Sequence, residues 1–279
     1  MQSELIHIEI GGGVAIATID NPPMNLLGSE LLVALDTLGR EVEANDAVRV
    51  LVMRSANPDF FIAHGDVEAM VGVPETPAAA EPPDELPWIH ACMDRFRTMP
   101  KVTIAQIEGY ARGGGSEVAL ACDMRFAVRG RAVFGQPEVG MGLLPGVGGT
   151  VRLMRLVGRA RASEIIFGGD DFTAVEAERL GWVNRALSPD EIGPHVDRLA
   201  RRIAGFPARA IAEIKRVMNY AERETLPQLR HEQHRFDHLM ADSDSRRLMR
   251  RWLDLGFQTP EGEQSIGMQL PKMGSGEAT

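Results

Sequence analysis

Residues 103–150, which determine the fold of this chain, have the sequence TIAQIEGYARGGGSEVALACDMRFAVRGRAVFGQPEVGMGLLPGVGGT. It predicts an apolar strand over Val102 to Ile107, a glycine-rich turn at 113–115, and a helix that begins at Ser116 and Glu117. Ser116 is a favourable N-cap residue, and the positive end of the helix dipole stabilises a carboxylate at Glu117. The pattern therefore predicts a strand, a turn and a helix, with unpaired backbone N–H groups at the turn.

This turn is suited to holding a negatively charged oxygen. The first N–H groups of a helix have no partner inside it, and glycines let a ligand oxygen approach them closely. A second carboxylate, Glu138, follows on the stiff turn Gly135-Gln136-Pro137-Glu138. Taken singly, Glu117 could simply satisfy the helix dipole, and Glu138 could be a loop carboxylate in water. Together with the turn, however, two carboxylates are typical of a site that moves protons next to a carbonyl group.

The same residues resemble a known family. EGYARGGGSEVALACDMRFA at 108–127, followed by FGQPEVGMGLLPGVGGTVRL at 134–153, closely resembles the crotonase (enoyl-CoA hydratase/isomerase) superfamily. The family's other signature, F-x-A-G-x-D, is similar to Phe61-Ile62-Ala63-His64-Gly65-Asp66. The resemblance extends over about residues 4–220 and is much more specific than a short glycine motif alone.

The resemblance implies a fold and an assembly. It implies an α/β fold in which repeated β-β-α units form a crotonase-like spiral, followed by an α-helical C-terminal module. Residues 1–187 are expected to form the α/β core, and residues 188–279 the helical module with its divergent tail. The family expectation for the assembly is a homotrimer or a dimer of trimers.

The resemblance also implies an activity on acyl-CoA thioesters. It places the two oxyanion-binding N–H groups on Gly65 and Gly114, and it implies that Glu117 and Glu138 share acid and base catalysis. Two glutamates favour an enoyl-CoA hydratase, which adds water to the double bond of a 2-enoyl-CoA. Double-bond isomerisation or another enolate reaction on a CoA ester is the alternative, and a non-catalytic acyl-CoA-binding relative is a third hypothesis. No cofactor is expected beyond the coenzyme A of the substrate.

Five further residues are predicted to contact the substrate or its coenzyme A. Ala63 and Asp66 lie in the first signature, and Met24 lies in a proline-rich loop that corresponds to one wall of the family's CoA groove. His64 stands where the family usually has glycine, so it either supports the loop as a buried imidazole or faces the acyl pocket. Arg112 precedes the glycine triplet, where a small or apolar residue is usual. It either reaches the CoA phosphates or forms a surface ion pair.

The composition limits the other classes of function. The chain has 279 residues, 44% of them hydrophobic, and a net charge of −9, which is unlike the basic surface of nucleic-acid-binding proteins. Its two cysteines, Cys92 and Cys122, are too few for a disulfide framework or a structural zinc site. We expect a cytoplasmic protein without a signal peptide or membrane segment. His231, His234 and His238 share one helical sector, but the H-E-x-x-H spacing is absent, so we assign no metal.

The flanking sequence predicts the outer elements. Alternating apolar residues predict a hairpin of Leu5 to Ile10 and Val14 to Ile19, and Ser29 is expected to cap a helix that runs to about Ala44. A strand is expected over Val48 to Arg54. Further helices are expected at about 88–99, 151–156, 161–167, 174–180, 194–203, 208–221 and 226–240. The acidic, proline-rich segment 71–87 lacks periodicity, and we expect a mobile excursion near the acyl end of the site.

Overall fold

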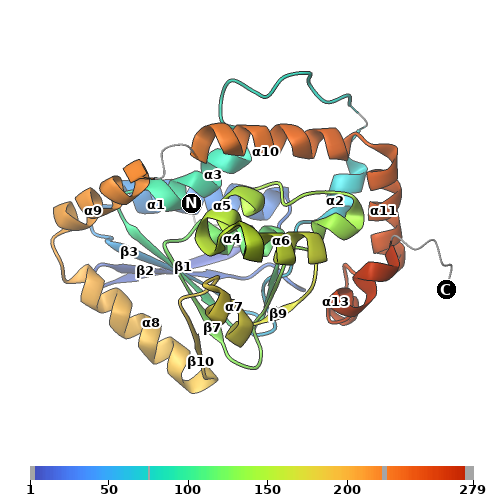
Figure 1. The fold of residues 1–279 in the computed structure, drawn as a ribbon. Helices are drawn as coiled ribbons and strands as arrows, with labels where there is room; N and C mark the ends of the chain where they lie inside the picture. The colour runs from blue at the N-terminus through green and yellow to red at the C-terminus, as the bar shows by residue number, and fades with distance from the viewer. Residues whose placement is uncertain (1–3, 75, 222–224, 274–279) are drawn as a thin grey trace.

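The computed structural model describes residues 4–74, 76–221 and 225–273, and its centre is a pair of β-sheets (Figure 1). The larger sheet has six strands in the order β1-β2-β3-β5-β7-β10. Their bounds are Ile6–Gly11, Val14–Ile19, Val50–Ser55, Val102–Ile107, Met124–Val128 and Arg185–Leu187. β1 and β2 form an antiparallel hairpin, and the other neighbouring strands of this sheet are parallel.

The smaller sheet contains β4, β6, β8 and β9, and from β3 to β8 its strands alternate along the chain with those of the larger sheet. Their bounds are Phe60–Ile62, Tyr110–Arg112, Val133–Gly135 and Phe172–Thr173. Each of β3, β5 and β7 is followed by a strand of the smaller sheet, and α1 (Ser29–Ala44), α3 (Trp88–Thr98) and α4 (Gly114–Leu120) join successive pairs. The predicted α/β fold of repeated β-β-α units is confirmed.

The remaining helices surround these sheets. α2, the 3-10 helix η1, α5, α6 and α7 lie at Val67–Gly72, Pro137–Met141, Gly149–Val157, Arg159–Gly168 and Ala174–Leu180. After β10, α8 to α13 lie at Pro189–Ala204, Ala208–Ala221, Thr225–Met240, Ser243–Asp254, Pro260–Glu263 and Ile266–Gln269, and a 3-10 turn at Leu270–Met273 follows. α10 packs on α5, and α11 packs on α2, so the C-terminal part covers one side of the core (Figure 1).

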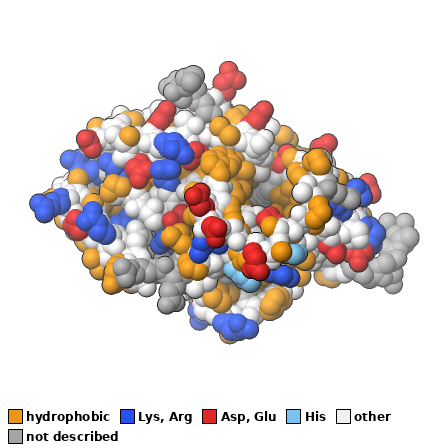
Figure 2. Space-filling view, turned by 90° about the horizontal axis from the view of Figure 1, so that it is seen from above, with side chains coloured by type: hydrophobic (Ala, Val, Ile, Leu, Met, Phe, Trp, Pro, Cys, Tyr) orange, Lys and Arg blue, Asp and Glu red, His pale blue; other side chains and the backbone are white. Residues whose placement is uncertain are grey.

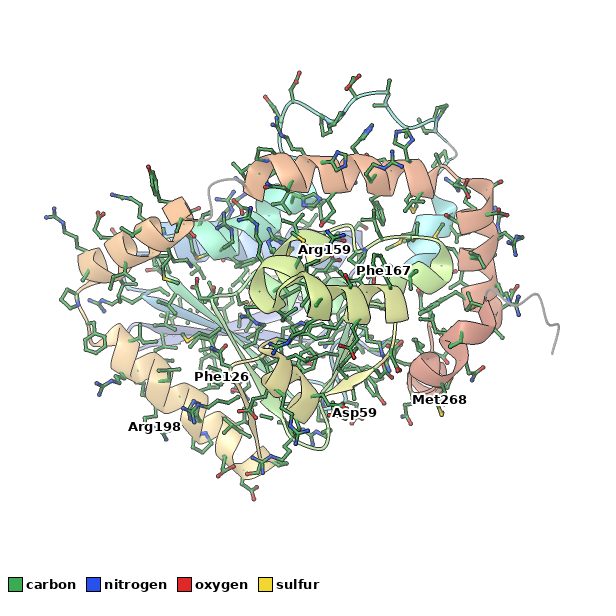
Figure 3. All side chains as sticks on the ribbon, viewed as in Figure 1. Asp59, Phe126, Arg159, Phe167, Arg198 and Met268 are labelled. Atoms are coloured by element: carbon green, nitrogen blue, oxygen red, sulfur yellow. The ribbon has the colours of Figure 1, made fainter. Side chains whose placement is uncertain are left out.

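The apolar core lies on both faces of the larger sheet. On one face, Phe134 and Trp182 are almost fully buried among apolar residues of α1, α3 and α4. On the other face, Ile192 and Val196 of α8 pack against the sheet. Figure 3 shows how side chains fill these layers. The ring of Phe126, in β7, packs against the ring of His195 in α8, with 5.0 Å between the two ring centres. Because both faces are covered, most residues of the central parallel strands are apolar.

The start of α4 differs from the prediction. The helix begins at Gly114, and its N-cap is Gly113, whose φ of +45° suits glycine. Ser116 is therefore not the N-cap, and that prediction was wrong; its side chain is fully buried within the helix. The reason is the packing of α4 on β4: a Cβ on Gly115 would lie 1.9 Å from the carbonyl oxygen of Ile62. Only glycine fits this contact.

Two other helices also begin differently from the predictions. Ser29 is the first residue of α1, and Gly28 is its N-cap. α8 begins at Pro189, earlier than predicted, after a capping box formed by Ser188 and Glu191. Pro194, the predicted start, lies inside this helix. The sequence also gave no prediction for α11, α12 and α13.

Segment 73–87 passes over the outer side of α10 (Figure 1). Among its described residues there is no helix or strand. The predicted segment began at residue 71, but residues 71 and 72 form the end of α2. The guanidinium of Arg230 in α10 donates a hydrogen bond to the carbonyl of Asp84 and so joins the segment to this helix. The predicted mobility of this segment stays a prediction.

Charged side chains of both signs lie on the surface (Figure 2), and the two thiols lie in the interior. Figure 2 shows acidic and basic side chains interspersed on the face that carries α10. Cys92 and Cys122 are both buried free thiols. None of the helices in the described part of the chain combines the length and apolar composition needed to cross a bilayer. The cytoplasmic location stays a prediction.

The contact of Gly115 with β4 gives a prediction about stability. Gly115→Ala places a methyl group against the Ile62 carbonyl and should lower the free energy of unfolding by about 3 kcal/mol. Gly193→Ala, in the middle of α8, is the matched control, since no atom lies within 4 Å of the added carbon. It should raise the free energy of unfolding by about 1 kcal/mol. Urea unfolding measures both changes, and equal stabilities would contradict this packing.

Candidate active site

A cavity of about 330 Å³ lies between the loop after β4, the turn into α4, η1 and α10. Most of its wall is apolar. The apolar side chains that line it are Leu27, Leu32, Val67, Met70, Val73, Ile89, Met141, Leu143, Val147, Phe236 and Met240. Gly65, Gly114, Glu117 and Glu138 also line it. An apolar pocket with a few placed polar groups is the usual form of a small-molecule site.

The amides of Gly65 and Gly114 come close together at this cavity. A Cβ built on Gly114 would lie 3.3 Å from the nitrogen of Gly65 and 2.8 Å from a methyl carbon of Leu27. Gly65 pairs with Leu27 as an isolated parallel bridge, and Gly114 is the first residue of α4. Within the described residues, neither amide donates a hydrogen bond. Two unpaired N–H groups beside one cavity can bind an oxyanion.

The side chain of Glu117 is held by the glycine-rich loop before α5. Its Oε1 accepts hydrogen bonds from the amides of Val147 (2.6 Å) and Gly149 (2.7 Å). Oε2 has no donor among the described residues. Burial raises the pKa of Glu117 to about 7, although the two amides act in the opposite direction by stabilising the ionised form. One oxygen is thus fixed while the other is available for proton transfer near neutral pH.

Glu138 is buried without comparable partners. It lies in the 3-10 helix η1, which begins at Pro137, and its Oε2 has no hydrogen-bond partner in the described structure. Burial, and secondly the charge of Glu117, raise the pKa of Glu138 well above its ordinary value. Burial and mutual repulsion favour a state in which one carboxylate is protonated over a state in which both are charged. The pair can therefore both accept and deliver a proton beside the two free amides.

A third buried carboxylate, Glu232 of α10, was missed from the sequence. Its Oε1 accepts from the amide of Gly148 (2.5 Å) and its Oε2 from the amide of Val151 (2.9 Å). Burial and then the charge of Glu117 raise the pKa of Glu232 to about 8. The four amides from 147 to 151 that bind carboxylates are thus divided between Glu117 and Glu232. Nothing local in the sequence signals this contact, because the partners are far apart along the chain.

The predicted substrate-binding residues divide into two groups. His64 and Asp66 line the cavity. Met24, Ala63 and Arg112 are not among the described residues that line it. Met24 and Ala63 are buried beneath the loop, where the amide of Ala63 donates to the Met24 carbonyl. Arg112 is fully buried and paired with carboxylates, so the prediction of a surface ion pair was wrong. The predicted contact of Arg112 with the CoA phosphates gains no support from this position.

The histidines of α10 do not form a metal site in the described structure. The rings of His234 and His238 are 4.6 Å apart, and those of His231 and His234 are 6.5 Å apart. Among the described residues, no three histidine, cysteine, aspartate or glutamate side chains are arranged to hold a metal ion.

Comparisons with known proteins agree with this geometry. The chain matches the family model of enoyl-CoA hydratase/isomerase over residues 9–256. It is 33% identical over 229 residues to the short-chain-enoyl-CoA hydratase of Clostridium acetobutylicum, covering 78% of this chain and 82% of that protein. It is 34% identical over 220 residues to the crotonyl-CoA hydratase of Syntrophomonas wolfei, covering 78% and 83%.

Solved structures of similar fold also match this chain. A crystal structure from Streptomyces avermitilis has a TM-score of 0.87 at 36% identity, covering 97% of this chain and 98% of that chain. The crystal structure of enoyl-CoA hydratase from Bacillus halodurans has a TM-score of 0.80 at 26% identity, covering 89% and 100%. The resemblance inferred from the sequence, and the crotonase-like fold that it implied, are therefore confirmed.

The raised pKa of Glu138 predicts a pH effect on stability. Because the folded protein favours the protonated form, the stabilisation is complete below the ordinary pKa of 4.5 and is lost as the pH rises through the raised value. Glu138→Gln removes this titration. The unfolding free energy of the variant should therefore rise relative to that of wild type as the pH is raised from 5 to 8.

The control is Glu178→Gln, which removes an exposed carboxylate in α7. Its difference from wild type should change little over the same pH range. Denaturant unfolding at several pH values measures both differences. Parallel curves for wild type and Glu138→Gln would contradict the buried, unpartnered state of Glu138.

Proposed function

The chain belongs to the enoyl-CoA hydratase/isomerase family, and we propose that it adds water to the double bond of a 2-enoyl-CoA thioester. The observation that carries this proposal is the placement of two free amides and two buried glutamates around one apolar cavity. A thioester needs an oxyanion site, and hydration needs one group to take a proton and another to give one. All three requirements are available within one site.

In this mechanism the thioester oxygen accepts hydrogen bonds from the amides of Gly65 and Gly114. Glu117 takes a proton from water through Oε2, and the water oxygen bonds to the β-carbon of the substrate. The electron pair of the double bond moves toward the thioester oxygen, where the two amides stabilise the enolate. Glu138 then protonates the α-carbon. Proton exchange between the two glutamates restores the starting state.

The walls of the cavity support a hydrocarbon acyl group as substrate. Met70, Ile89 and Phe236 line it, and both ring nitrogens of His64 are occupied by protein acceptors. His64 therefore offers no free N–H group to a polar acyl substituent. Coenzyme A enters as part of the substrate, and the proposal needs no other cofactor.

Replacing either glutamate tests this mechanism. Glu117→Gln and Glu138→Gln should each lower kcat/KM for crotonyl-CoA by at least about 100-fold, because general acid–base catalysis contributes about 10²–10⁴-fold. The loss of the enoyl absorbance measures the rate. Calorimetry with butyryl-CoA should show that both variants still bind an acyl-CoA.

The exposed substitution Glu178→Gln serves as the control and should leave the rate unchanged. If wild type instead converts a 3-enoyl-CoA to its 2-enoyl isomer and does not hydrate crotonyl-CoA, the chain is an isomerase. Tight binding of acyl-CoA without turnover on a broad panel of enoyl-CoA substrates would favour the non-catalytic hypothesis.

We also propose that the chain assembles as a homotrimer or a dimer of trimers. Three large apolar side chains of α9 support an intersubunit contact: Ile214, Val217 and Met218 are each more than 60% exposed. In Figure 1, α9 lies at the outer edge of the molecule, away from α11. Neighbouring exposed apolar side chains are typical of a protein contact.

The substitution Val217→Asp tests this assembly. A buried, unpaired charge at the contact should dissociate the oligomer, because isolated charges are costly to desolvate. Light scattering should give a trimer or hexamer for wild type and a monomer for the variant. A monomeric wild type would contradict the proposed assembly, and an oligomeric Val217→Asp would show that α9 is not the contact.

A further inference from the structure

His64 and Arg112, the two departures from the family pattern, meet on one carboxylate. Nε2 of His64 lies 3.0 Å from Oε2 of Glu263, and Nη1 of Arg112 lies 2.5 Å from Oε1 of the same residue. Glu263 is the last residue of α12, and neither it nor Arg112 is exposed to solvent. One C-terminal glutamate thus joins the two loops that carry the amides of Gly65 and Gly114.

Asp171 holds the other edge of the Arg112 guanidinium. Nε of Arg112 donates to Oδ1 of Asp171 at 2.6 Å, and Nη2 donates to Oδ2 at 2.7 Å. Such bidentate pairs fix the plane of the guanidinium as well as its position. The guanidinium also lies 4.3 Å from the centre of the Tyr110 ring. Arg112 is therefore fixed on three sides.

The ring nitrogens of His64 both face acceptors. Nδ1 lies 2.6 Å from the carbonyl oxygen of Gly65. Nε2 faces Oε2 of Glu263 and, at 3.4 Å, the carbonyl oxygen of Phe257. Acceptors at both nitrogens favour the doubly protonated imidazolium. Burial acts to lower the pKa of His64, but the charge of Glu263 and the hydrogen-bond acceptors around the ring together outweigh it, and the pKa lies above its ordinary value.

These four side chains form a charge quartet of two cations, His64 and Arg112, and two anions, Glu263 and Asp171. Removing Glu263 alone would leave His64 without its anion and Arg112 with a single carboxylate. Because a buried charge without a partner is costly, the two loops would shift or His64 would lose its proton.

Further contacts anchor the C-terminal segment to the loop after β4. The side chain of Gln258 accepts a hydrogen bond from the amide of Val67 (2.7 Å) and donates one to Oδ1 of Asp66 (3.0 Å). The ring of Trp252 meets the ring of His64 edge-on at 5.7 Å. Glu263 therefore acts from a segment that is itself fixed against this loop.

We propose that Glu263 is a positioning residue for the oxyanion hole: by pairing with His64 and Arg112 at once, it fixes the separation of the Gly65 and Gly114 amides. The inference rests on the hydratase activity proposed above. Both amides must point at one oxygen, and a displacement of about 1 Å at a reacting group can lower a rate by about 100-fold. Glu263 touches neither substrate nor water in this role.

Glu263→Gln keeps the size of the side chain and removes the shared negative charge. It should lower kcat for crotonyl-CoA by about 10- to 100-fold and change KM by less than about threefold, because the amides act mainly in the transition state. The double variant Glu263→Gln/His64→Gln removes one charge of each sign. If the two residues are coupled, the loss of kcat in the double variant should be smaller than the product of the losses in Glu263→Gln and His64→Gln. A mere loss of stability would not produce this recovery.

Asp123→Asn is the matched control, because it breaks another buried ion pair, with Lys215 at 2.7 Å, whose members do not line the cavity. It should lower the Tm and leave kcat unchanged. Hydrogen exchange at the hydrogen-bonded amides of Asp66 and Gly113, which neighbour Gly65 and Gly114, gives a readout that needs no activity. Exchange should be faster in Glu263→Gln than in wild type and unchanged in Asp123→Asn.

The two proposals can fail separately. If wild type hydrates no enoyl-CoA but Glu263→Gln still loosens both amides, the proposed function is wrong and the positioning role stands. If wild type hydrates crotonyl-CoA and Glu263→Gln keeps its kcat and its amide exchange, the positioning role is wrong.

Discussion

The close approach of two backbone segments, the end of β4 and the turn from β6 into α4, is the constraint on which this structure depends. Gly115 lies against the carbonyl of Ile62 with no space for a side chain, and Gly114 lies against the nitrogen of Gly65 with little space for one. Parallel pairing of β4 and β6 brings these segments together. Strand pairing and glycine together therefore set two unpaired amides side by side, and every chemical feature of the site is arranged around them.

The buried carboxylates described above fall into two groups, whose pKa values are shifted in opposite directions. Glu117, Glu138 and Glu232 are buried mainly against apolar groups and amides, and burial raises the pKa of each. Burial also acts to raise the pKa of Glu263, but the charges of His64 and Arg112 outweigh it, and that pKa is lowered. Carboxylates with raised pKa values can exchange protons near neutral pH, whereas a carboxylate beside two cations stays charged and holds its surroundings in place. The reactive and positioning roles proposed here follow from that difference.

The predictable parts of this structure are those with local signals. The strand, turn and helix of 103–150 could be predicted because apolar runs, glycines and a carboxylate follow one another directly. The cap at Gly113 could not, since it rests on the positive φ of that residue and on packing against β4, a segment about 50 residues earlier in the chain. Glu232 and Glu263 were missed for a related reason: each acts on residues more than 80 positions away in the chain. α12 and α13 are too short to give a periodic pattern.

A crystal structure of the complex with butyryl-CoA, a saturated thioester that cannot be hydrated, tests the central claim most directly. The account predicts that the thioester oxygen lies about 2.7–3.1 Å from both the Gly65 and Gly114 nitrogens. It also predicts that the acyl chain fills the apolar cavity beside Glu117 and Glu138. A thioester oxygen bound to other groups, or an acyl chain outside this cavity, would contradict the account.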